Sequence, residues 1–380
     1  MTRVVTALIN DIPTDQRVLK QVDVLKDLGC CVTVVCRRRS SMTISVAGLN
    51  VFRMRFIINH GPLFYLSYNC RLLLYLVFHR FDIYIANDLD TLLPNFIISR
   101  LKRKPLVYDA HEYFTGQYGL EENSFAYNTW TRIERWIITG LKYMITVNDS
   151  IADLYYKQYG VLPVVVRNTA WSAASVKPVK RTDLGIDPDI LLAVMQGTGL
   201  NQGRGLTELI DALKITPGVH LLLIGSGDAV REIKKRINDA GLSERVTIFP
   251  NMSWPEMISY TMACDVGISL DKPSSINQKL SLPNKLFDYI SSGLPVIGSA
   301  LPEICAITDR YGCGITVDEV SPGAVSEALS KLRDNRELLS VLQKNSRMAS
   351  IELTWEKERE KEAELFRSVI ESDSKKAFRN

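Results

Sequence analysis

Short apolar runs alternate with longer segments of helical periodicity along most of this 380-residue chain. Residues 4–9 form the first run, residues 16–28 a helical pattern, and residues 32–36 a second run after Gly29. This alternation is typical of βαβ units in a parallel sheet, and uninterrupted apolar runs are typical of strands buried on both faces. The pattern therefore predicts an α/β fold, with further strands at residues 83–86, 106–109, 144–147 and 164–166.

The pattern stops between residues 171 and 189, where the chain is polar, lacks periodicity and contains Pro178, Gly185 and Pro188. Such a stretch is typical of a linker. The alternation then resumes, with helical segments after Gly205 and Asp228 and strand-like runs at residues 191–195, 219–224, 246–248, 266–269 and 295–297.

A chain of this length fits two domains, each with a core of its own. We expect two Rossmann-like, doubly wound domains that face a central cleft, one of residues 1–172 and one of residues 173–353. The charged helical pattern at residues 354–375 is expected to pack back on the first domain.

Composition agrees with a globular protein, since the chain is 46% hydrophobic and 23% charged. The longest apolar stretch, residues 63–78, contains Asn69 and Arg71 and is shorter than the span of about 20 residues that crosses a bilayer. We expect a helix packed on the sheet, with an aromatic helix touching a membrane as the alternative. Residues 1–9 lack the long apolar core of a signal peptide, which favours the cytoplasm.

The positive charge is concentrated in the first half of the chain. Up to Ala170 there are 20 Lys and Arg against 14 Asp and Glu, and afterwards 26 against 28. The basic clusters at residues 37–39 and 100–104 suit phosphates or an anionic membrane surface, or are solvated loop charge. Seven cysteines without metal-ligand spacing predict reduced, buried thiols.

Ligands of open parallel sheets bind beyond the carboxyl ends of the strands. The strongest candidate there is residues 281–297, a loop, a helix, a Gly-Leu-Pro turn and a strand. Pro283 suits the first turn of a helix, so the amides near Asn284, Lys285 and Leu286 are predicted to face an anion such as a diphosphate, with the lysine adding charge. One turn later, Asp288 is either an acceptor for ribose hydroxyls or an ordinary surface carboxylate.

A second candidate is the glycine-rich segment at residues 196–205, which follows a strand and precedes a helix. Its glycines allow a backbone to approach a ligand closely, and Arg204 can grip phosphate oxygens. The turn at Gly225 is a weaker example of the same pattern. In the first half, His111 follows a short strand, where a histidine can hydrogen-bond a sugar or have a structural role.

Together these segments resemble the retaining glycosyltransferase family 4, which has the GT-B fold. Residues 10–18 leading into 29–35 resemble its amino-terminal unit, residues 108–112 the strand with its cleft histidine, residues 204–206 the start of its phosphate-gripping helix, and residues 283–297 its most diagnostic segment.

The resemblance implies a hexosyltransferase-type enzyme that uses a nucleotide sugar as co-substrate, with no further cofactor and no metal. It implies catalytic roles for His111, Arg204 and Lys285. The donor would be bound by Gly197, Thr198, Gly199, Arg204, Gly225, Leu282, Pro283, Asn284, Lys285, Leu286 and Asp288, and the acceptor would lie near Asp11, Thr14, Asp15, Arg17 and His111.

Two positions depart from the family pattern. Its first glutamate, eight positions before Asp288, is Leu280 here, and a basic residue common five places before Arg204 is Gly199. A further segment, Asp88-Leu89-Asp90, has the DxD form that holds a divalent metal in other glycosyltransferases, but it also fits a strand end and a helix N-cap, which we favour.

The sequence thus predicts transfer of a sugar to a glycan or lipid-linked acceptor in cell-surface polysaccharide biosynthesis. The basic first domain is expected to contact the inner face of the membrane, and no nucleic acid is expected as a partner. A sugar-nucleotide epimerase of the same architecture is one alternative. A degenerate, non-catalytic sugar-nucleotide-binding protein is another, suggested by Leu280 and Gly199.

Overall fold

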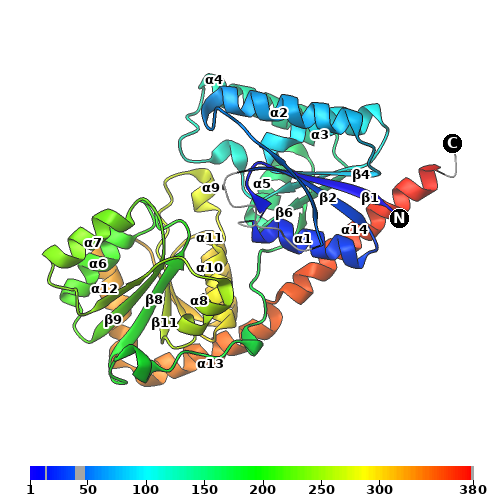
Figure 1. Ribbon diagram of the computed structural model, residues 1–380. Helices are drawn as coiled ribbons and strands as arrows, with labels where there is room; N and C mark the ends of the chain where they lie inside the picture. Colours follow the sequence, from blue (N-terminus) through cyan, green and yellow to red (C-terminus); the bar gives the residue numbers. More distant parts are fainter. Residues whose placement is uncertain (13–14, 39–47, 378–380) are drawn as a thin grey trace. The chain divides into compact units, whose positions relative to one another are not determined.

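The structure, a computed structural model, describes residues 1–12, 15–38 and 48–377 of the chain. It divides into two compact units, one of Met1–Asn168 with Glu358–Asn380 and one of Thr169–Lys357 (Figure 1). Each unit is built around a parallel sheet. Within the described residues, no helix has both the length and the apolar character needed to cross a membrane.

Sheet A belongs to the first unit. Its strands are β1 (Arg3–Leu8), β2 (Cys31–Arg37), β3 (Asn50–Met54), β4 (Ile83–Asn87), β5 (Leu106–Ala110), β6 (Tyr143–Thr146) and β7 (Val164–Val165). They lie in the order β3-β2-β1-β4-β5-β6-β7, and every pairing is parallel. The chain moves outward from β1 and then returns to β4 on the other side of β1, so the order reverses between β1 and β4. Such a switch point is where doubly wound sheets bind ligands.

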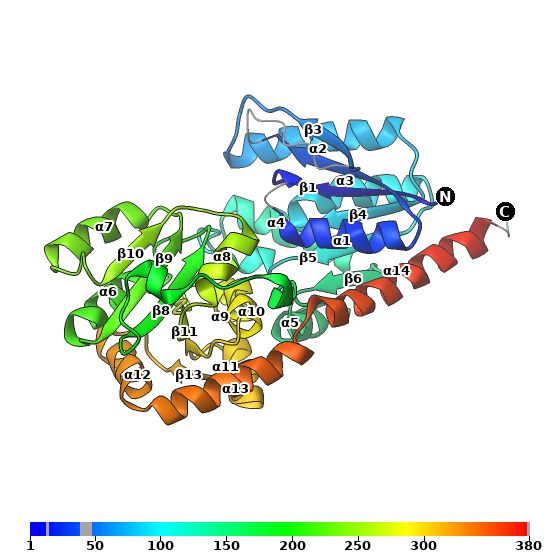
Figure 2. The same cartoon turned by 60° about the horizontal axis from the view of Figure 1, so that its bottom comes forward.

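Helices cover both faces of sheet A. They are α1 (Gln16–Asp27), α2 (Gly61–Phe78), α3 (Leu89–Leu101), α4 (Phe125–Ile138), α5 (Asp149–Tyr159) and the final helix α14 (Trp355–Ala377). Figures 1 and 2 show α2, α3 and α4 on one face and α1 with α14 on the other. Most of α14 thus packs in the first unit although it follows the second unit in sequence.

Sheet B repeats this plan in the second unit. Its strands are β8 (Leu191–Gly197), β9 (Val219–Gly225), β10 (Val246–Phe249), β11 (Val266–Ser269), β12 (Val296–Ser299) and β13 (Gly314–Val317). They lie in the order β10-β9-β8-β11-β12-β13, again all parallel, and the order reverses between β8 and β11. The helices of this unit are α6 (Leu206–Ile215), α7 (Val230–Asp239), α8 (Trp254–Thr261), α9 (Ile276–Lys279), α10 (Asn284–Ser291), α11 (Pro302–Tyr311), α12 (Pro322–Asp334) and α13 (Arg336–Glu352).

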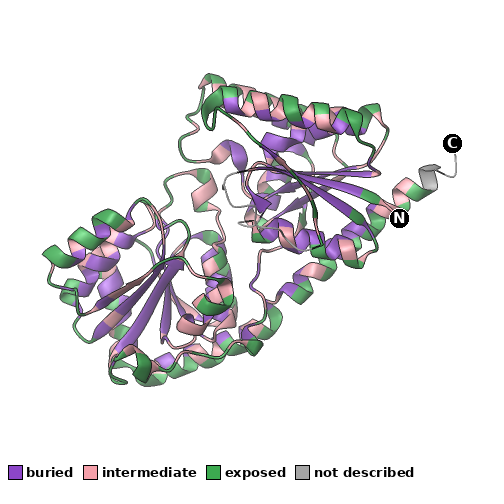
Figure 3. Ribbon diagram, in the orientation of Figure 1, coloured by how far each residue is buried: buried purple, intermediate pink, exposed green. Residues whose placement is uncertain are grey.

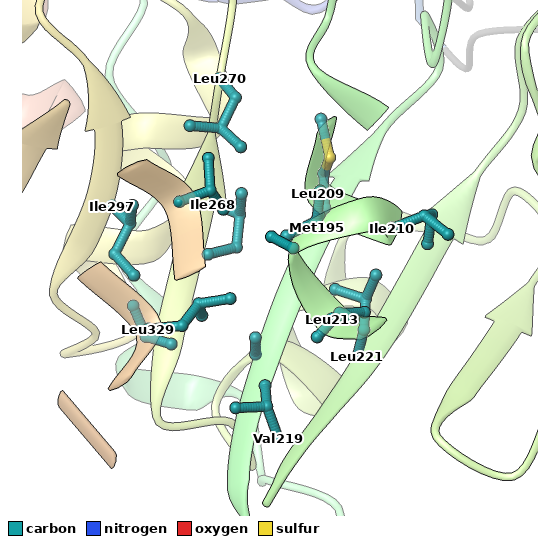
Figure 4. Packing of buried hydrophobic residues seen from close by; sticks show 14 of the residues in the cluster. Met195, Leu209, Ile210, Leu213, Val219, Leu221, Ile268, Leu270, Ile297 and Leu329 are labelled. Atoms are coloured by element: carbon teal, nitrogen blue, oxygen red, sulfur yellow. The ribbon is translucent and has the colours of Figure 1, made fainter. Parts of the chain in front are cut away.

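The four central strands of sheet B, β8, β9, β11 and β12, consist almost entirely of buried residues (Figure 3). Because side chains alternate along a strand, successive residues of β8 enter two different cores. Met195 belongs to the same buried cluster as Leu209 of α6 and Leu329 of α12 (Figure 4), whereas Val194 belongs to a second cluster with Phe287 of α10. The continuous apolar run is therefore explained by helices on both faces.

The predicted fold class, two Rossmann-like doubly wound α/β domains, is confirmed. Two strands were not predicted, β3 and β13. Both lie at sheet edges, where β3 alternates exposed and partly buried residues and β13 is mostly half-buried, so neither has the apolar run that marks a central strand. All seven cysteines are free as expected, but Cys31 and Cys70 are exposed and Cys305 is half-buried rather than buried.

Two glycines bring the carboxyl ends of β8 and β9 into close contact. Gly225 has φ +137°, and a Cβ atom placed on it would lie 1.9 Å from the carbonyl oxygen of Gly197. A side chain at residue 225 would thus push apart the two strand ends that lead into the glycine-rich loops. Gly225 therefore has a packing role that its position in a turn did not reveal.

Replacing Gly225 by alanine should destabilise the second unit by about 3 kcal/mol or more, because it adds a backbone clash to an unfavourable φ. The measurement is denaturant unfolding followed by circular dichroism. Gly241→Ala is the control: Gly241 also has a positive φ, +66°, but its Cβ would meet nothing within 4 Å. That variant should lose only about 1 kcal/mol. Equal losses in the two variants would contradict this account.

Candidate functional site

The predicted donor-binding segments meet at the carboxyl edge of sheet B. Gly197 ends β8, Gly225 ends β9, and α10 begins at Asn284 before the chain enters β12. The loops after β8 and β9 are joined by the amide of Leu200, which donates to the carbonyl of Ser226 at 2.9 Å. Thr198 and Gly199 are exposed at this edge. The glycine-rich loops therefore lie beside the switch point of the sheet.

Three charged side chains from different elements converge here. Arg204 lies in the loop before α6, Lys285 in the first turn of α10, and Asp271 two residues beyond β11. Arg204 Nη1 is 2.7 Å from Asp271 Oδ1, and Lys285 Nζ is 3.3 Å from Asp271 Oδ2. The exposed fraction is 1% for the Asp271 side chain, 12% for Lys285 and 36% for Arg204. Two cations therefore share one buried anion, and both are nearer the solvent than the anion is.

The ionisation of this cluster follows from burial and charge together. Burial alone would raise the pKa of Asp271, but Lys285 and Arg204 outweigh burial and hold that pKa below its usual range. The pKa of Lys285 is lowered, chiefly by burial and partly by Arg204, while Asp271 opposes the change. Asp271 is thus ionised and is the group that favours the proton on Lys285.

The start of α10 differs in detail from its prediction. Pro283 is the N-cap residue and Asn284 the first helical residue. The amide of Leu286 donates to the carbonyl of Pro283 at 3.0 Å, so this amide, predicted to face an anion, already has a partner. Leu282 packs against the core of the second unit, whereas Asn284 is exposed. Of the amides predicted to face an anion, those of Asn284 and Lys285 remain at the start of α10.

Asp288 lies one turn further along α10 and is held by two donors. Trp254 Nε1 donates to its Oδ1 at 2.9 Å, and Gln196 Nε2 donates to its Oδ2 at 3.2 Å. Gln196 is itself fixed by Thr261, whose hydroxyl donates to it at 2.6 Å. Asp288 is therefore an oriented, half-buried carboxylate rather than an ordinary surface acid. A carboxylate has about four acceptor positions, so it can still accept from a ligand hydroxyl.

His111 in the first unit lies between two carboxylates. Its ring Nδ1 is 3.5 Å from Asp88 Oδ2, its Nε2 is 3.5 Å from Asp109 Oδ2, and its side chain is 17% exposed. Burial by itself would lower the pKa of His111, but Asp88 and Asp109 raise it to about 9. The side chain is thus an imidazolium at neutral pH, at the carboxyl end of β5.

A buried hydrogen-bond network fixes Asp109 behind His111. Arg17 Nη2 donates to Asp109 Oδ1 at 2.6 Å, and Gln21 Nε2 donates to its Oδ2 at 3.1 Å. Burial would raise the pKa of Asp109, but Arg17 and His111 hold it far below the usual range. Glu362 of α14 joins this network through Gln21, and its burial raises its pKa to about 8. The final helix of the chain therefore contributes a side chain to the surroundings of His111.

The residues predicted on the acceptor side make contacts within the first unit. Arg17 is buried against Asp109, Asp11 is 3.3 Å from Arg53 Nε, and Asp15 caps α1 by accepting the amide of Val18 at 3.1 Å. Thr14 lies outside the described residues. Their role toward an acceptor stays a prediction.

The DxD segment needs a correction. Asp88 does occupy the N-cap position of α3, but its carboxylate does not cap the helix; it accepts the backbone amide of His111 at 2.9 Å. Asp90 is buried, and this raises its pKa well above the usual range. Among the residues that the structure describes, no group of three or more His, Cys, Asp or Glu side chains is arranged to hold a metal ion.

Sequence reasoning missed several residues that shape these two sites. Asp271 and Asp109 organise the cations, and Gln196 and Trp254 orient Asp288. A lone acidic residue at or just beyond the carboxyl end of a predicted strand was a usable signal for the first two. Nothing in the spacing indicated Trp254, which reaches Asp288 from another helix.

Comparison with protein-family models identifies the class of protein to which the chain belongs. The model described as glycosyl transferases group 1 matches residues 177–349, and the model described as Glycosyltransferase Family 4 matches residues 16–169. The chain therefore belongs to the group 1 glycosyltransferases of family 4. It is an enzyme that transfers a sugar from a nucleotide sugar. A search of curated proteins finds no significant match.

Solved structures with the GT-B architecture resemble the whole chain at low identity. A sucrose-phosphate synthase from Thermosynechococcus elongatus has a TM-score of 0.80 at 16% identity, covering 98% of this chain and 100% of its own. HepE from Anabaena, solved with UDP and glucose, has a TM-score of 0.76 at 17% identity, with coverage of 97% and 100%. WaaG, a glycosyltransferase of lipopolysaccharide biosynthesis, has a TM-score of 0.72 at 16% identity, with coverage of 95% and 99%. These similarities show that the fold is GT-B.

The first unit should lose stability as the pH rises from 6.5 to 9.5. Folding raises the pKa of Glu362 to about 8 and that of His111 to about 9, so the folded unit keeps protons that the unfolded chain releases. The contribution of Glu362 is complete below its ordinary pKa of 4.5 and is lost as the pH rises through about 8; that of His111 is complete below 6.5 and is lost through about 9.

Glu362→Gln should remove the contribution of Glu362 to stability, which changes by about 2 kcal/mol between pH 6.5 and 9.5. The fall in melting temperature over this pH range should therefore be smaller in the variant. Calorimetry at the two pH values measures it. Glu364→Gln, an exposed position on the same helix, is the control and should behave like the unchanged protein. An equal fall in melting temperature for all three proteins would show that Glu362 does not hold its proton.

Proposed function

We propose that this glycosyltransferase retains the anomeric configuration, needs no metal ion, and transfers a sugar to a glycan or lipid-linked acceptor in cell-surface polysaccharide biosynthesis. One observation carries the proposal. Arg204, Lys285 and the start of α10 converge at the carboxyl edge of sheet B, where they suit the diphosphate of a nucleotide-sugar donor. The structures of HepE with UDP and glucose and with UDP-glucose support a donor of this kind.

The chemistry requires that the departing nucleoside diphosphate be stabilised as the sugar becomes oxocarbenium-like. The guanidinium of Arg204 and the ammonium of Lys285 neutralise the developing charge, and the first amides of α10 add a favourable dipole. Both cations are already held in place by Asp271, so little reorganisation is needed during the reaction. These two cations supply the charge that a bound metal supplies in other transferases, which supports a metal-independent reaction.

Asp288 is proposed to accept hydrogen bonds from the ribose hydroxyls of the donor. It lies one turn after Lys285 on the same helix, so both side chains can contact neighbouring parts of one ligand. The exposed backbone of Thr198 and Gly199 suits close approach of the donor to the loop after β8. For Gly197 and Gly225, close packing of the two strand ends is the main proposed role, and binding of the donor is a secondary one.

On the first unit, the imidazolium of His111 is proposed to contact an oxygen of the transferred sugar or the acceptor, in exchange for one of its long 3.5 Å contacts with a carboxylate. Its charge is maintained by Asp88 and Asp109, so it can act as a donor at neutral pH. In the mechanism that the family resemblance implies, the acceptor attacks the face from which the diphosphate leaves, and this accounts for retention.

A screen of UDP-, GDP-, ADP-, CDP- and dTDP-sugars by thermal shift and hydrolysis, with and without a chelator, tests the donor site. One donor should raise the melting temperature, and the chelator should not change the result. Arg204→Ala and Asp288→Ala should each weaken binding of that donor about tenfold or more, since each removes a charge-assisted or oriented hydrogen bond. Exposed charges of α7, Arg231→Ala and Asp239→Ala, serve as controls.

The outcomes separate the parts of this proposal. Activity that disappears with the chelator contradicts metal independence, and inversion of the anomeric carbon, read by NMR of the product, contradicts retention. Conversion of the donor without any acceptor indicates an epimerase, and binding without turnover for any acceptor a non-catalytic protein.

We further propose that the first unit contacts an anionic membrane through helix α2. Phe64, Tyr68, Leu72 and Leu76 are buried at intervals of four residues, which fixes one face of α2 against the protein. Apolar side chains elsewhere on this helix are 57% to 79% exposed: Leu63, Leu66, Leu74 and Phe78. An apolar surface flanked by cations is typical of helices that lie in a membrane interface.

The basic cluster after α3 contributes to this surface only in part. Lys102 Nζ donates to the carbonyl of Leu76 at 2.7 Å, and Lys104 pairs with Asp82 and Asp373. These lysines therefore stabilise the first unit itself. Arg100 and Arg103 are exposed, and both are proposed to face anionic headgroups, although Arg100 also donates to the carbonyl of Gly140 at 3.3 Å.

The double variant L66D/L74D should bind vesicles of phosphatidylglycerol and phosphatidylcholine about tenfold less than the unchanged protein, because it places two carboxylates in the contact surface. Co-sedimentation with these vesicles and with pure phosphatidylcholine measures the effect. V341D/M348D on α13, which alters exposed apolar residues of the second unit, is the control. Equal recovery of the unchanged protein with both kinds of vesicle would count against membrane contact.

A further inference from the structure

Asp271 is fixed by contacts beyond those with its two cations. Its carbonyl accepts the hydroxyl of Ser299 at 2.7 Å, and the next amide, of Lys272, donates to the carbonyl of Gly203 at 2.9 Å. The hydroxyl of Ser269 reaches Oδ2 at 3.4 Å. The end of β12, the loop before α6 and the end of β11 thus all fix this one residue.

The carboxylate is nevertheless out of reach of a ligand. Asp271 is 1% exposed, whereas Arg204 and Lys285 are more exposed and have hydrogen-bond donors left over. A guanidinium carries five N–H donors and an ammonium three, and the contacts with Asp271 use one of each. The buried anion therefore acts through the two cations and does not touch the ligand.

We propose that Asp271 is a positioning residue of the donor site, whose buried carboxylate keeps Arg204 and Lys285 side by side so that both contact the donor diphosphate. The proposal rests on the proposed function of this edge as the diphosphate site. Two like charges this close repel each other, and a largely buried ammonium without a counter-ion tends to lose its proton. A shared anion allows the guanidinium of Arg204 and the ammonium of Lys285 to stay charged next to each other.

The other charged groups near Lys285 have partners of their own. Asp288, on the same helix, accepts from Trp254 and Gln196, and Lys272 pairs with Glu208 of α6 at 2.6 Å. Arg204 carries the same sign as Lys285 and favours loss of its proton. Asp271 is therefore the group whose removal changes the charge state of the lysine.

The test measures binding of a nucleoside diphosphate to D271N by calorimetry at pH 6, 7.5 and 9. The probe is whichever of UDP, GDP, ADP, CDP and dTDP binds the unchanged protein, and the corresponding nucleoside is measured beside it. At pH 7.5 the diphosphate should bind D271N about tenfold to a hundredfold more weakly, because one charge-assisted contact is lost and the other is misplaced. Nucleoside binding should change less than twofold.

The pH profile distinguishes positioning from a structural role. Diphosphate affinity of D271N should recover at pH 6 and fall further at pH 9 than in the unchanged protein, because without Asp271 the burial of Lys285 and the charge of Arg204 lower the pKa of the lysine further. Adding Lys285→Met should abolish this extra dependence. D271E, which restores the negative charge, should restore the pH dependence of the unchanged protein. Asp271→Ser, with a smaller polar side chain, replaces D271N if that variant does not fold.

Asp265→Asn is the matched control. Asp265 is also a largely buried acid bound to an arginine, with Arg181 Nη1 3.0 Å from its Oδ2, but it lies before β11 at the other end of the strand. This variant should lose stability without losing diphosphate affinity. If D271N binds diphosphate as well as the unchanged protein at every pH, the positioning role is wrong while the donor site stands. If the unchanged protein binds none of the five diphosphates, both proposals fail.

Discussion

The cost of burying a carboxylate governs both sites of this enzyme. An ionised acid removed from water is stable only when opposite charges and hydrogen bonds surround it. Asp109 in the first unit is paired with Arg17 and His111, and Asp271 in the second with Arg204 and Lys285. Each acid lies at the carboxyl end of a parallel sheet. In both units, the buried anion thus brings cations to the edge where such sheets bind ligands.

The repeated sheet order explains why the two sites have the same construction. A parallel strand buried on both faces leaves polar groups only at its ends, and the crossover helices start or finish there. In the second unit this edge brings together the loop before α6, the residues after β11 and the first turn of α10. The contact between Gly197 and Gly225 makes the edge compact enough for these loops to support one another.

Much of this architecture was predictable from the sequence, because alternation of apolar runs and helical segments depends on neighbouring residues alone. The bounds of the central strands were predicted to within two residues, and among the described strands the half-exposed edge strands β3 and β13 were missed. Individual residues such as Arg204 and Lys285 could be predicted because they belong to recognisable segments. Their shared partner Asp271, and the Trp254 contact with Asp288, could not, since spacing along the chain does not tell which distant side chains meet.

Helix α14 has a consequence for how the protein is made. Glu358 of this helix accepts the amide of Arg167 at 3.0 Å, and Glu362 is buried near Arg17, so the first unit includes residues that follow the whole second unit in sequence. A ribosome synthesises sheet A before the second unit and α14 after it. The first unit therefore completes its packing only after the second unit has been synthesised, and until then one face of sheet A lacks the cover of α14.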